Sequence, residues 1–271
     1  MTASIVIPCH NNLHLTRQCL VSIARHTPDA HEVVLVDNGS TDGTAEWFAG
    51  CGCDGALVQN PENLGFAAAA NQGLAAAEGT HVVLLNNDTI VTPGWLTGLL
   101  AGFEREAGVG IVAPRANYVG GEQLLRGVSY DSAPSPKLDV FAAERHLRLA
   151  GRGFETRVLS GLCMAISAAV VDAIGGFDPA FGIGGWEDID YSLRARLAGF
   201  RLWVAEDSYV HHFGGETFGL LDASYEALIR DNEALYAAKW GVPLQGAVYA
   251  HAPGRPFDPS LDRIPLPLLV A

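Results

Sequence analysis

The sequence predicts an α/β fold with a mostly parallel central sheet flanked by helices. Short runs of Val, Ile and Leu alternate with helical patterns over roughly the first 115 residues. The apolar runs contain no regular polar alternation, which is typical of strands buried on both faces. Strands that alternate with helices favour parallel pairing through right-handed crossovers. Polar residues cluster where these strands end, at the edge where such sheets bind ligands.

The predicted strands are residues 4–8, 32–37, 56–60, 81–88 and 110–114. The predicted helices between them are residues 13–26, 44–50, 66–78 and 94–106. Residues 116–155 carry glycines, prolines and lone charges without a period, so we expect a mobile segment there. Order is expected to return from residue 158, with a strand at 200–207 and a last helix at 222–240.

Composition narrows the class of protein. Hydrophobic residues make up 49% of the 271 residues, which is ample for a core, and the net charge of −13 argues against a nucleic-acid partner. The five cysteines lack metal-ligand spacing, and we expect all of them to be reduced thiols in a cytosolic protein. The first residues lack the basic and apolar segments of a signal peptide. Polar residues interrupt the apolar stretch Val158–Phe177, which therefore predicts buried core rather than a membrane span.

Asp37 follows the second predicted strand, in VVLVDNGSTDGT. Asp and Ser side chains in such loops commonly satisfy backbone N–H groups. An acid after an early strand can instead accept hydrogen bonds from a nucleobase or a ribose. Neither GxGxxG nor GxxxxGK[ST] occurs here, so the usual dinucleotide and P-loop signatures are absent.

The segment NPENLGFAAAANQG (60–73) places a glycine at a helix start, before four alanines. Small side chains let a ligand approach, although tight packing of a helix on the sheet explains the alanines equally well. Asn63, Gly65 and Asn71 are harder to explain by packing, and we treat them as candidate ligand-binding residues.

Asp88 ends the apolar run VVLLNND, after Asn86 and Asn87. It either caps a turn or binds a divalent cation, since Mg²⁺ commonly takes one or two carboxylates with phosphate oxygens and water. A metal site needs a second protein ligand, which YVHHFGGETF offers in His211 or His212. Adjacent residues of an extended segment point to opposite faces, so only one of the two histidines can reach the metal.

Three acids, Glu187, Asp188 and Asp190, begin the predicted helix WEDIDYSLRARLAGF. Acids in the first turn interact favourably with the helix dipole, each by ~0.3–1 kcal/mol. An ionised acid there can also act as a general base. Trp186, just before them, can form either the wall of a sugar site or part of the core.

Six segments together resemble the inverting glycosyltransferases of family 2, which have the GT-A fold. In chain order they are SIVIPCHNN, VVLVDNGSTDGT, NLGFAAAANQG, LLNNDT, GGFDPAF and WEDIDYSLRARLAGF, and they cover roughly residues 3–220. NLGFAAAANQG with LLNNDT is most similar to the bacterial rhamnosyltransferase-like branch, which builds cell-surface polysaccharide. The resemblance implies a GT-A domain at 1–240, with a nucleotide-sugar half at 1–115 and an acceptor half at 116–240. A Pro-rich tail follows at 241–271.

The resemblance also implies a role for each candidate residue. The donor-binding residues would be Pro8, His10, Asp37, Asn38, Asn63, Gly65, Asn71, Asn86 and Asn87, with Asp37 on the nucleobase. Asp88 corresponds to the second acid of the family's metal-binding DxD motif, and Asn86 stands where the first acid would be. His212 resembles the family's late metal-ligand histidine. Asp188 would be the base that deprotonates the acceptor hydroxyl.

The implied reaction moves a sugar, with inversion, from a dTDP- or UDP-linked donor to a hydroxyl of a saccharide or lipid-linked saccharide. The cofactor would be Mg²⁺ or Mn²⁺. We expect a cytoplasmic protein with at most peripheral contact at the inner face of the membrane. Two alternatives stay open. One is a nucleotide-sugar-binding protein without turnover, which Asn86 favours. The other is a sugar nucleotidyltransferase, although a Gly-rich basic loop is missing after the first strand.

Overall fold

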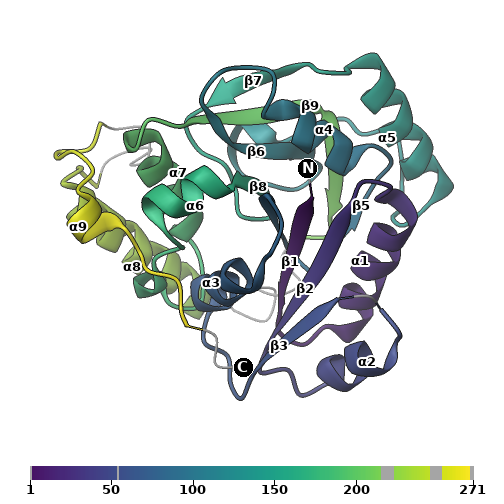
Figure 1. The fold of residues 1–271 in the computed structure, drawn as a ribbon, viewed down its shortest axis with the longest axis horizontal. Helices are drawn as coiled ribbons and strands as arrows, with labels where there is room; N and C mark the ends of the chain where they lie inside the picture. Colours follow the sequence, from purple (N-terminus) through teal and green to yellow (C-terminus); the bar gives the residue numbers. More distant parts are fainter. Residues whose placement is uncertain (1, 54, 215–222, 245–251, 269–271) are drawn as a thin grey trace.

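The computed structural model describes residues 2–53, 55–214, 223–244 and 252–268, and a sheet lies at its centre (Figure 1). The strands are β1 (Ala3–Cys9), β2 (His31–Asn38), β3 (Ala56–Asn60), β4 (His81–Leu85), β5 (Thr89–Val91), β6 (Val109–Ala116), β7 (Gly153–Thr156), β8 (Cys163–Ser167) and β9 (Arg201–His212). Within these described residues all nine belong to one sheet, in the order β3-β2-β1-β4-β8-β6-β9-β5, and β7 pairs with β9.

Most strands of the sheet run in one direction, as the sequence predicts. β3, β2, β1 and β4 pair in parallel. β8 is antiparallel to both β4 and β6, so β6 runs in the same direction as β4, and β9 is parallel to β6. The carboxyl ends of these six strands therefore meet at one edge of the sheet.

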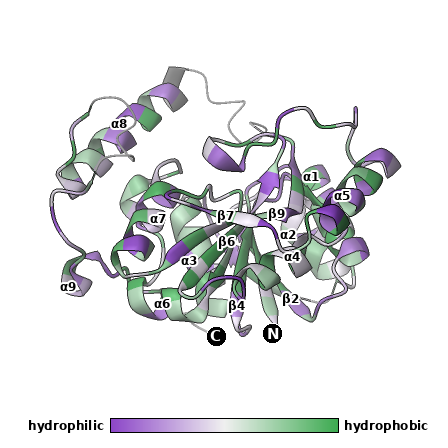
Figure 2. Cartoon of the chain, turned by 90° about the horizontal axis from the view of Figure 1, so that it is seen from above, coloured by the Kyte–Doolittle hydropathy of each residue, from purple (hydrophilic) through white to green (hydrophobic). Residues whose placement is uncertain are grey.

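Helices cover both faces of the sheet (Figure 1). One face carries α1 (Leu13–His26), α2 (Thr44–Gly50) and α4 (Trp95–Gly102), and the other carries α3 (Phe66–Ala76), α6 (Ala168–Ile174) and α7 (Glu187–Leu197). Successive residues of β1 point to opposite faces of the sheet. Ile5 and Ile7 pack towards α1, whereas Val6 packs towards α3. Figure 2 shows the apolar strands between the more polar outer faces of the helices.

The helices predicted at 13–26 and 44–50 are confirmed with the same boundaries. The strand predicted at 81–88 is shorter, because β4 ends at Leu85 and the chain turns over residues 86–88 into β5. Thr89 Oγ1 donates a 2.7 Å hydrogen bond to Asn86 O across this turn. β5 then pairs antiparallel with β9.

The expectation of a mobile segment at 116–155 is wrong. This segment contains a 3₁₀ turn (Gly121–Gln123), the helix α5 (Pro136–Arg148) and the strand β7. Ser135 caps α5 by accepting a hydrogen bond from Leu138 N, and Pro136 occupies the first turn, where proline is tolerated. Leu138 and Ala142, one turn apart, are buried against Ile90 and Tyr209. This short apolar stripe is too sparse to stand out among the prolines and charges around it.

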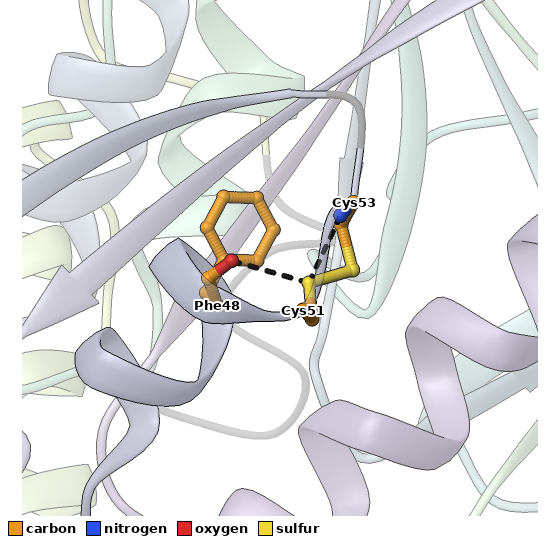
Figure 3. Close-up of a disulfide and its surroundings, with 3 residues drawn as sticks. All are labelled: Phe48, Cys51 and Cys53. Carbon is orange, nitrogen blue, oxygen red and sulfur yellow. Dashed lines mark hydrogen bonds between the residues drawn. A yellow bond between two sulfur atoms is a disulfide. The ribbon is translucent and has the colours of Figure 1, made fainter.

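The expectation of five reduced thiols is also wrong for two cysteines. Cys51 and Cys53 form a disulfide just after α2 (Figure 3). Gly52 between them has a φ of 68°, which turns the chain so that the two Cα atoms lie 5.3 Å apart, within disulfide range. Cys9, Cys19 and Cys163 are buried free thiols.

The last two helices, α8 (Ala223–Trp240) and α9 (Pro259–Asp262), lie outside α7 and α6 (Figure 1). The predicted start of α8 at Asp222, and tail residues 245–251 and 269–271, fall outside the described residues. Part of the tail packs on α8, where the Arg255 guanidinium lies 4.5 Å from the Trp240 ring centroid and pairs with Asp262. No helix in the described ranges is long and apolar enough to cross a membrane.

Asp190 joins α7 to α8. Its carboxylate is fully buried and accepts 2.8 Å hydrogen bonds from Arg194 Nε and Trp240 Nε1. Lys239 Nζ also lies 2.8 Å from Oδ1. Both oxygens of this acid are therefore engaged inside the protein, and its role is to hold the two helices together.

We predict that Asp190→Asn lowers the free energy of unfolding by roughly 3–5 kcal/mol, because it leaves Arg194 as an uncompensated buried charge, whereas Lys239 keeps its ion pair with Asp178. Urea unfolding monitored by circular dichroism measures this. Asp231→Asn, at an exposed position of α8, is the control and should change stability by less than about 0.5 kcal/mol. Equal effects of the two substitutions would contradict the assignment.

Candidate active site at the carboxyl edge of the sheet

A cavity of about 550 Å³ opens at the edge where the parallel strands end. Segments far apart in the sequence line it, including Asn86 after β4, Tyr118 after β6, Ser160 and Gly161 before β8, Glu187 and Asp188 on α7, and His212 at the end of β9. Of the residues proposed from the sequence, Asn86, Asp188 and His212 line this cavity. Tyr118 and Ser160 are lining residues that the sequence did not single out, and Glu187 stood out only as one of three acids at the helix start.

Asp88 does not line the cavity itself but contacts His212, which does. The Asp88 side chain is buried, and its Oδ1 is 3.2 Å from His212 Nε2. This oxygen makes no well-directed hydrogen bond within the described part of the chain. The β5–β9 register pairs Thr89 with His212, which brings Asp88 to this position.

The other ring nitrogen of His212 fixes the orientation of the imidazole. Nδ1 is 2.7 Å from the carbonyl oxygen of Tyr118, and only a protonated Nδ1 can donate to that oxygen. Nε2 then carries the lone pair when the ring is neutral. Burial lowers the pKa of His212, but Asp88 and the Tyr118 carbonyl raise it by more, so the pKa lies above its usual value.

Asp88 and His212 together fit a divalent cation. Asp88 Oδ1 and His212 Nε2 lie 3.2 Å apart, and a carboxylate oxygen and an imidazole nitrogen are both ligand types that Mn²⁺ accepts. Among the described residues no group of three or more His, Cys, Asp or Glu gathers around one point. The remaining ligands would therefore be phosphate oxygens and water. His211 points the other way, with Nδ1 2.8 Å from the Tyr130 hydroxyl.

Asp188 lies at the start of α7 on the cavity wall. Its Oδ2 accepts a 3.0 Å hydrogen bond from Gly161 N, and its Oδ1 accepts a 2.8 Å bond from Ile189 N. These bonds fix the carboxylate but leave further lone pairs for a ligand. Burial raises the pKa of Asp188 above its usual value, which makes it a stronger base when ionised.

The turn that precedes α7 is strained, and it positions Glu187 and Asp188. Gly182, Gly184, Gly185 and Trp186 all have positive φ angles, and a tryptophan rarely adopts such a conformation. Asn232 of α8 holds the turn, because its buried Nδ2 is 2.9 Å from the carbonyl oxygens of Phe181 and Gly185 and 3.2 Å from that of Gly184. The Trp186 ring packs against Tyr236, with centroids 5.4 Å apart, so its ring is part of the α7–α8 core cluster.

The residues proposed for the nucleotide lie at the ends of β1 and β2. Asp37 is buried; its Oδ1 accepts a hydrogen bond from Ser40 N, and within the described residues its Oδ2 has no partner. Pro8 is buried in β1 next to Val36 of β2. The His10 ring is only partly buried, and its Nδ1 lies 3.0 Å from Asn38 O.

Three asparagines proposed as donor contacts have their amide groups bonded to other parts of the protein in this structure. The Asn38 side chain binds Asn63, Gly65 O, Asn60 and Leu64 N. Asn71 is buried and makes a reciprocal pair of bonds with the backbone of Phe177. Asn87 is buried and donates to Thr16 Oγ1 of α1. Their amide groups are thus engaged by residues distant in sequence.

Asn63 and Gly65 shape the wall beside the cavity. Asn63 Oδ1 accepts hydrogen bonds from Asn38 Nδ2 and Gly65 N. Gly65 has a φ of 86°, and a Cβ there would lie 2.2 Å from the carbonyl oxygen of Gly182. Only glycine fits this contact between the start of α3 and the turn before α7.

The structural comparison identifies known proteins with the same architecture. GalNAc-T7, solved with UDP, GalNAc and Mn²⁺, aligns over 78% of this chain and 44% of its own, with a TM-score of 0.61 and 18% identity. The mannosyltransferase PcManGT of Pyrobaculum calidifontis, in complex with GDP-Man and Mn²⁺, aligns over 87% of this chain and 64% of its own, with a TM-score of 0.61 and 19% identity. These similarities show that the fold is GT-A.

Sequence relatives point the same way. The pre-mycofactocin glycosyltransferase of Mycobacterium tuberculosis is 32% identical over 211 residues, which cover 77% of this chain and 42% of that protein. An uncharacterized protein of Sinorhizobium fredii, y4gI, is 28% identical over 226 residues, which cover 77% of this chain and 24% of that protein. The chain spans less than half the length of both relatives.

The family model of "Glycosyl transferase family 2" matches residues 4–175, which is well over half of the chain. The matched region contains Asp37, Asn86 and Asp88 but ends before the acids of α7 and before His212. The chain is a member of glycosyl transferase family 2.

Proposed function

We propose that this chain transfers a sugar from a nucleoside-diphosphate sugar to a hydroxyl group of an acceptor, with inversion at the anomeric carbon. The observation that carries the proposal is one cavity lined by both His212 and Asp188, with Asp88 3.2 Å from the His212 ring. Asp88 and His212 would form a metal corner, and Asp188 would be the base. The nucleotides and Mn²⁺ bound by the solved neighbours support this arrangement.

Asp88 and His212 would hold Mg²⁺ or Mn²⁺, whose charge would stabilise the diphosphate as it leaves. Asp188 takes the proton of the acceptor hydroxyl while the oxygen attacks C1 of the sugar from the face opposite the diphosphate. The C1–oxygen bond to the diphosphate breaks as the new bond forms, so one displacement inverts the configuration. No covalent intermediate on the protein is needed, unlike in retaining glycosidases.

The Asp188 carboxylate suits this role in two ways. Its bonds to Gly161 N and Ile189 N prevent the side chain from rotating away. Its raised pKa makes the carboxylate more basic, and a general base works best when its pKa approaches the working pH.

We assign the nucleobase to Asp37. Its buried Oδ2 has no partner among the described residues, and a carboxylate oxygen can accept the ring N–H of uracil or thymine. The donor that we propose is dTDP- or UDP-linked. The proposed acceptor is a saccharide or lipid-linked saccharide in cell-surface polysaccharide synthesis. The proposed location is the cytoplasm, with peripheral contact at the inner face of the membrane where a lipid-linked acceptor requires it.

Asn86 favours one alternative, a nucleotide-sugar-binding protein without turnover. This residue lines the cavity where the family's motif has its first acid, so it removes one negative charge from the metal corner. A binder of this kind would keep the nucleotide affinity of the transferase but would release no nucleoside diphosphate.

The metal corner predicts that Asp88→Ala and His212→Ala remove the Mn²⁺-dependent part of UDP or dTDP affinity, by more than about tenfold. Calorimetric titration of each nucleotide with and without Mn²⁺ measures this. His211→Ala is the matched control, because that ring faces Tyr130, and it should keep the metal dependence. Equal wild-type affinity with and without Mn²⁺ would contradict the metal site. Absence of nucleotide binding by folded wild type would overturn the donor assignment.

The base assignment predicts that Asp188→Asn lowers turnover by about 10²–10⁴-fold, because the amide cannot accept the proton. Release of UDP or dTDP from a panel of sugar nucleotides, with methyl glycosides as acceptors, measures turnover. Nucleotide affinity should stay within about threefold of wild type, since the metal corner is intact. Wild-type turnover in the variant would contradict the assignment. A wild type that binds sugar nucleotides but turns none over would favour the binding protein.

A further inference from the structure

Glu187 is a buried acid that the proposed reaction does not use. Its side chain is only 6% exposed, yet it lines the cavity beside Asp188. Its Oε2 has no hydrogen-bond partner in the described part of the chain. No Lys, Arg or His among the described residues lies within ion-pair distance of it. A buried carboxyl oxygen without a hydrogen-bond partner lowers the stability of the protein unless a ligand forms a hydrogen bond with it.

The surroundings of Glu187 favour its neutral form. Burial raises the pKa of Glu187 to about 8, and the neighbouring Asp188 carboxylate adds to the effect. Asp190, the other acid of the turn, has its charge balanced by Arg194 and by Lys239 of α8. Tyr118 and His212 are the titratable residues that line the same cavity from other elements. Glu187 therefore keeps its proton near neutral pH, and its Oε2 can be a donor.

We propose that Glu187 acts as a neutral carboxylic acid, and that its O–H group donates a hydrogen bond to an oxygen of the sugar being transferred. This inference rests on the proposed function and adds a residue that selects the donor sugar. The cavity is a single space bounded by Asn86 and His212 as well as by Glu187 and Asp188. A sugar linked to a diphosphate at the metal corner occupies that space, so its hydroxyl groups come to lie against Glu187.

The proposal also explains how two adjacent acids coexist in one cavity. If both were ionised they would repel one another at low dielectric, and Asp188 would be harder to ionise. A neutral Glu187 removes that repulsion and leaves Asp188 free to take the acceptor's proton. Pairs of acids with different protonation states commonly divide the work in this way. The turn held by Asn232 keeps both side chains in place.

The protonation state is tested without any substrate. The pKa of Glu187 is about 4.5 in the unfolded chain and about 8 in the folded protein, so between these two values the folded state holds a proton that the unfolded chain has lost. The stability that this proton provides is fully present below about pH 4.5 and is lost as pH rises towards 8. Wild type should therefore lose stability relative to Glu187→Gln over this range, in urea unfolding at pH 5, 6, 7 and 8.

Glu104→Gln, which removes an exposed charge, is the control and should follow wild type. Parallel profiles for wild type and Glu187→Gln between pH 5 and 8 would show that Glu187 is ionised at neutral pH. That result would overturn the inference whatever the protein binds.

The contact with the sugar is tested by calorimetry in the presence of Mn²⁺. UDP and dTDP are compared with UDP-glucose, UDP-N-acetylglucosamine and dTDP-rhamnose, and the gain in affinity due to the sugar is the quantity of interest. Glu187→Gln, which keeps a neutral donor, should retain the gain within about threefold. Glu187→Leu should reduce the gain in affinity due to the sugar by about tenfold while binding UDP and dTDP like wild type.

Equal losses in the Gln and Leu variants would show that Glu187 works as a carboxylate and would overturn the inference. A gain that is unchanged in Glu187→Leu would overturn the sugar contact. Both of these results leave the proposed function standing, because the parent nucleotides still bind. If the wild type binds neither nucleotide, the proposed function is overturned. The proposed contact between Glu187 and the donor sugar is then overturned with it.

Discussion

The antiparallel pairing of β5 with β9 is the constraint on which the candidate site depends. Thr89 pairs with His212, and Phe213 N donates a 3.0 Å hydrogen bond to Asp88 O. These contacts bring a carboxylate from the first half of the chain to a histidine near its end. A slip of one residue in the register would turn His211 towards the cavity and His212 towards Tyr130, because side chains alternate along a strand.

The three acids at the start of α7 show how burial and partners give different properties to neighbouring residues. Asp190 is enclosed by Arg194, Lys239 and Trp240 and holds two helices together. Asp188 is held by backbone N–H groups on the cavity wall. Glu187 is buried without a counter-ion, which raises its pKa. One helix turn thereby supplies a structural ion pair, a proposed base and a neutral acid.

Much of the site's framework was predictable, because it depends on local patterns. The apolar runs located the parallel strands, and their ends located Asp37, Asn86 and Asp88 along one edge of the sheet. The uses of Asn71 and Asn38 were not predictable, since their partners lie in other segments: Asn71 binds the backbone of Phe177, and Asn38 binds Asn63 and Leu64 N. Tyr118 was missed because it begins a segment with no clear period.

The sequence by itself determined the α/β class, the boundaries of several elements and the resemblance to family 2 glycosyltransferases. These follow from side-chain periodicity and short motifs, which act over a few residues. Only the tertiary structure decided that β8 runs against its neighbours, that Cys51 pairs with Cys53 and that His212, rather than His211, meets Asp88. Strand direction, burial and charge environment depend on contacts between segments far apart in the chain, and no local pattern encodes those contacts.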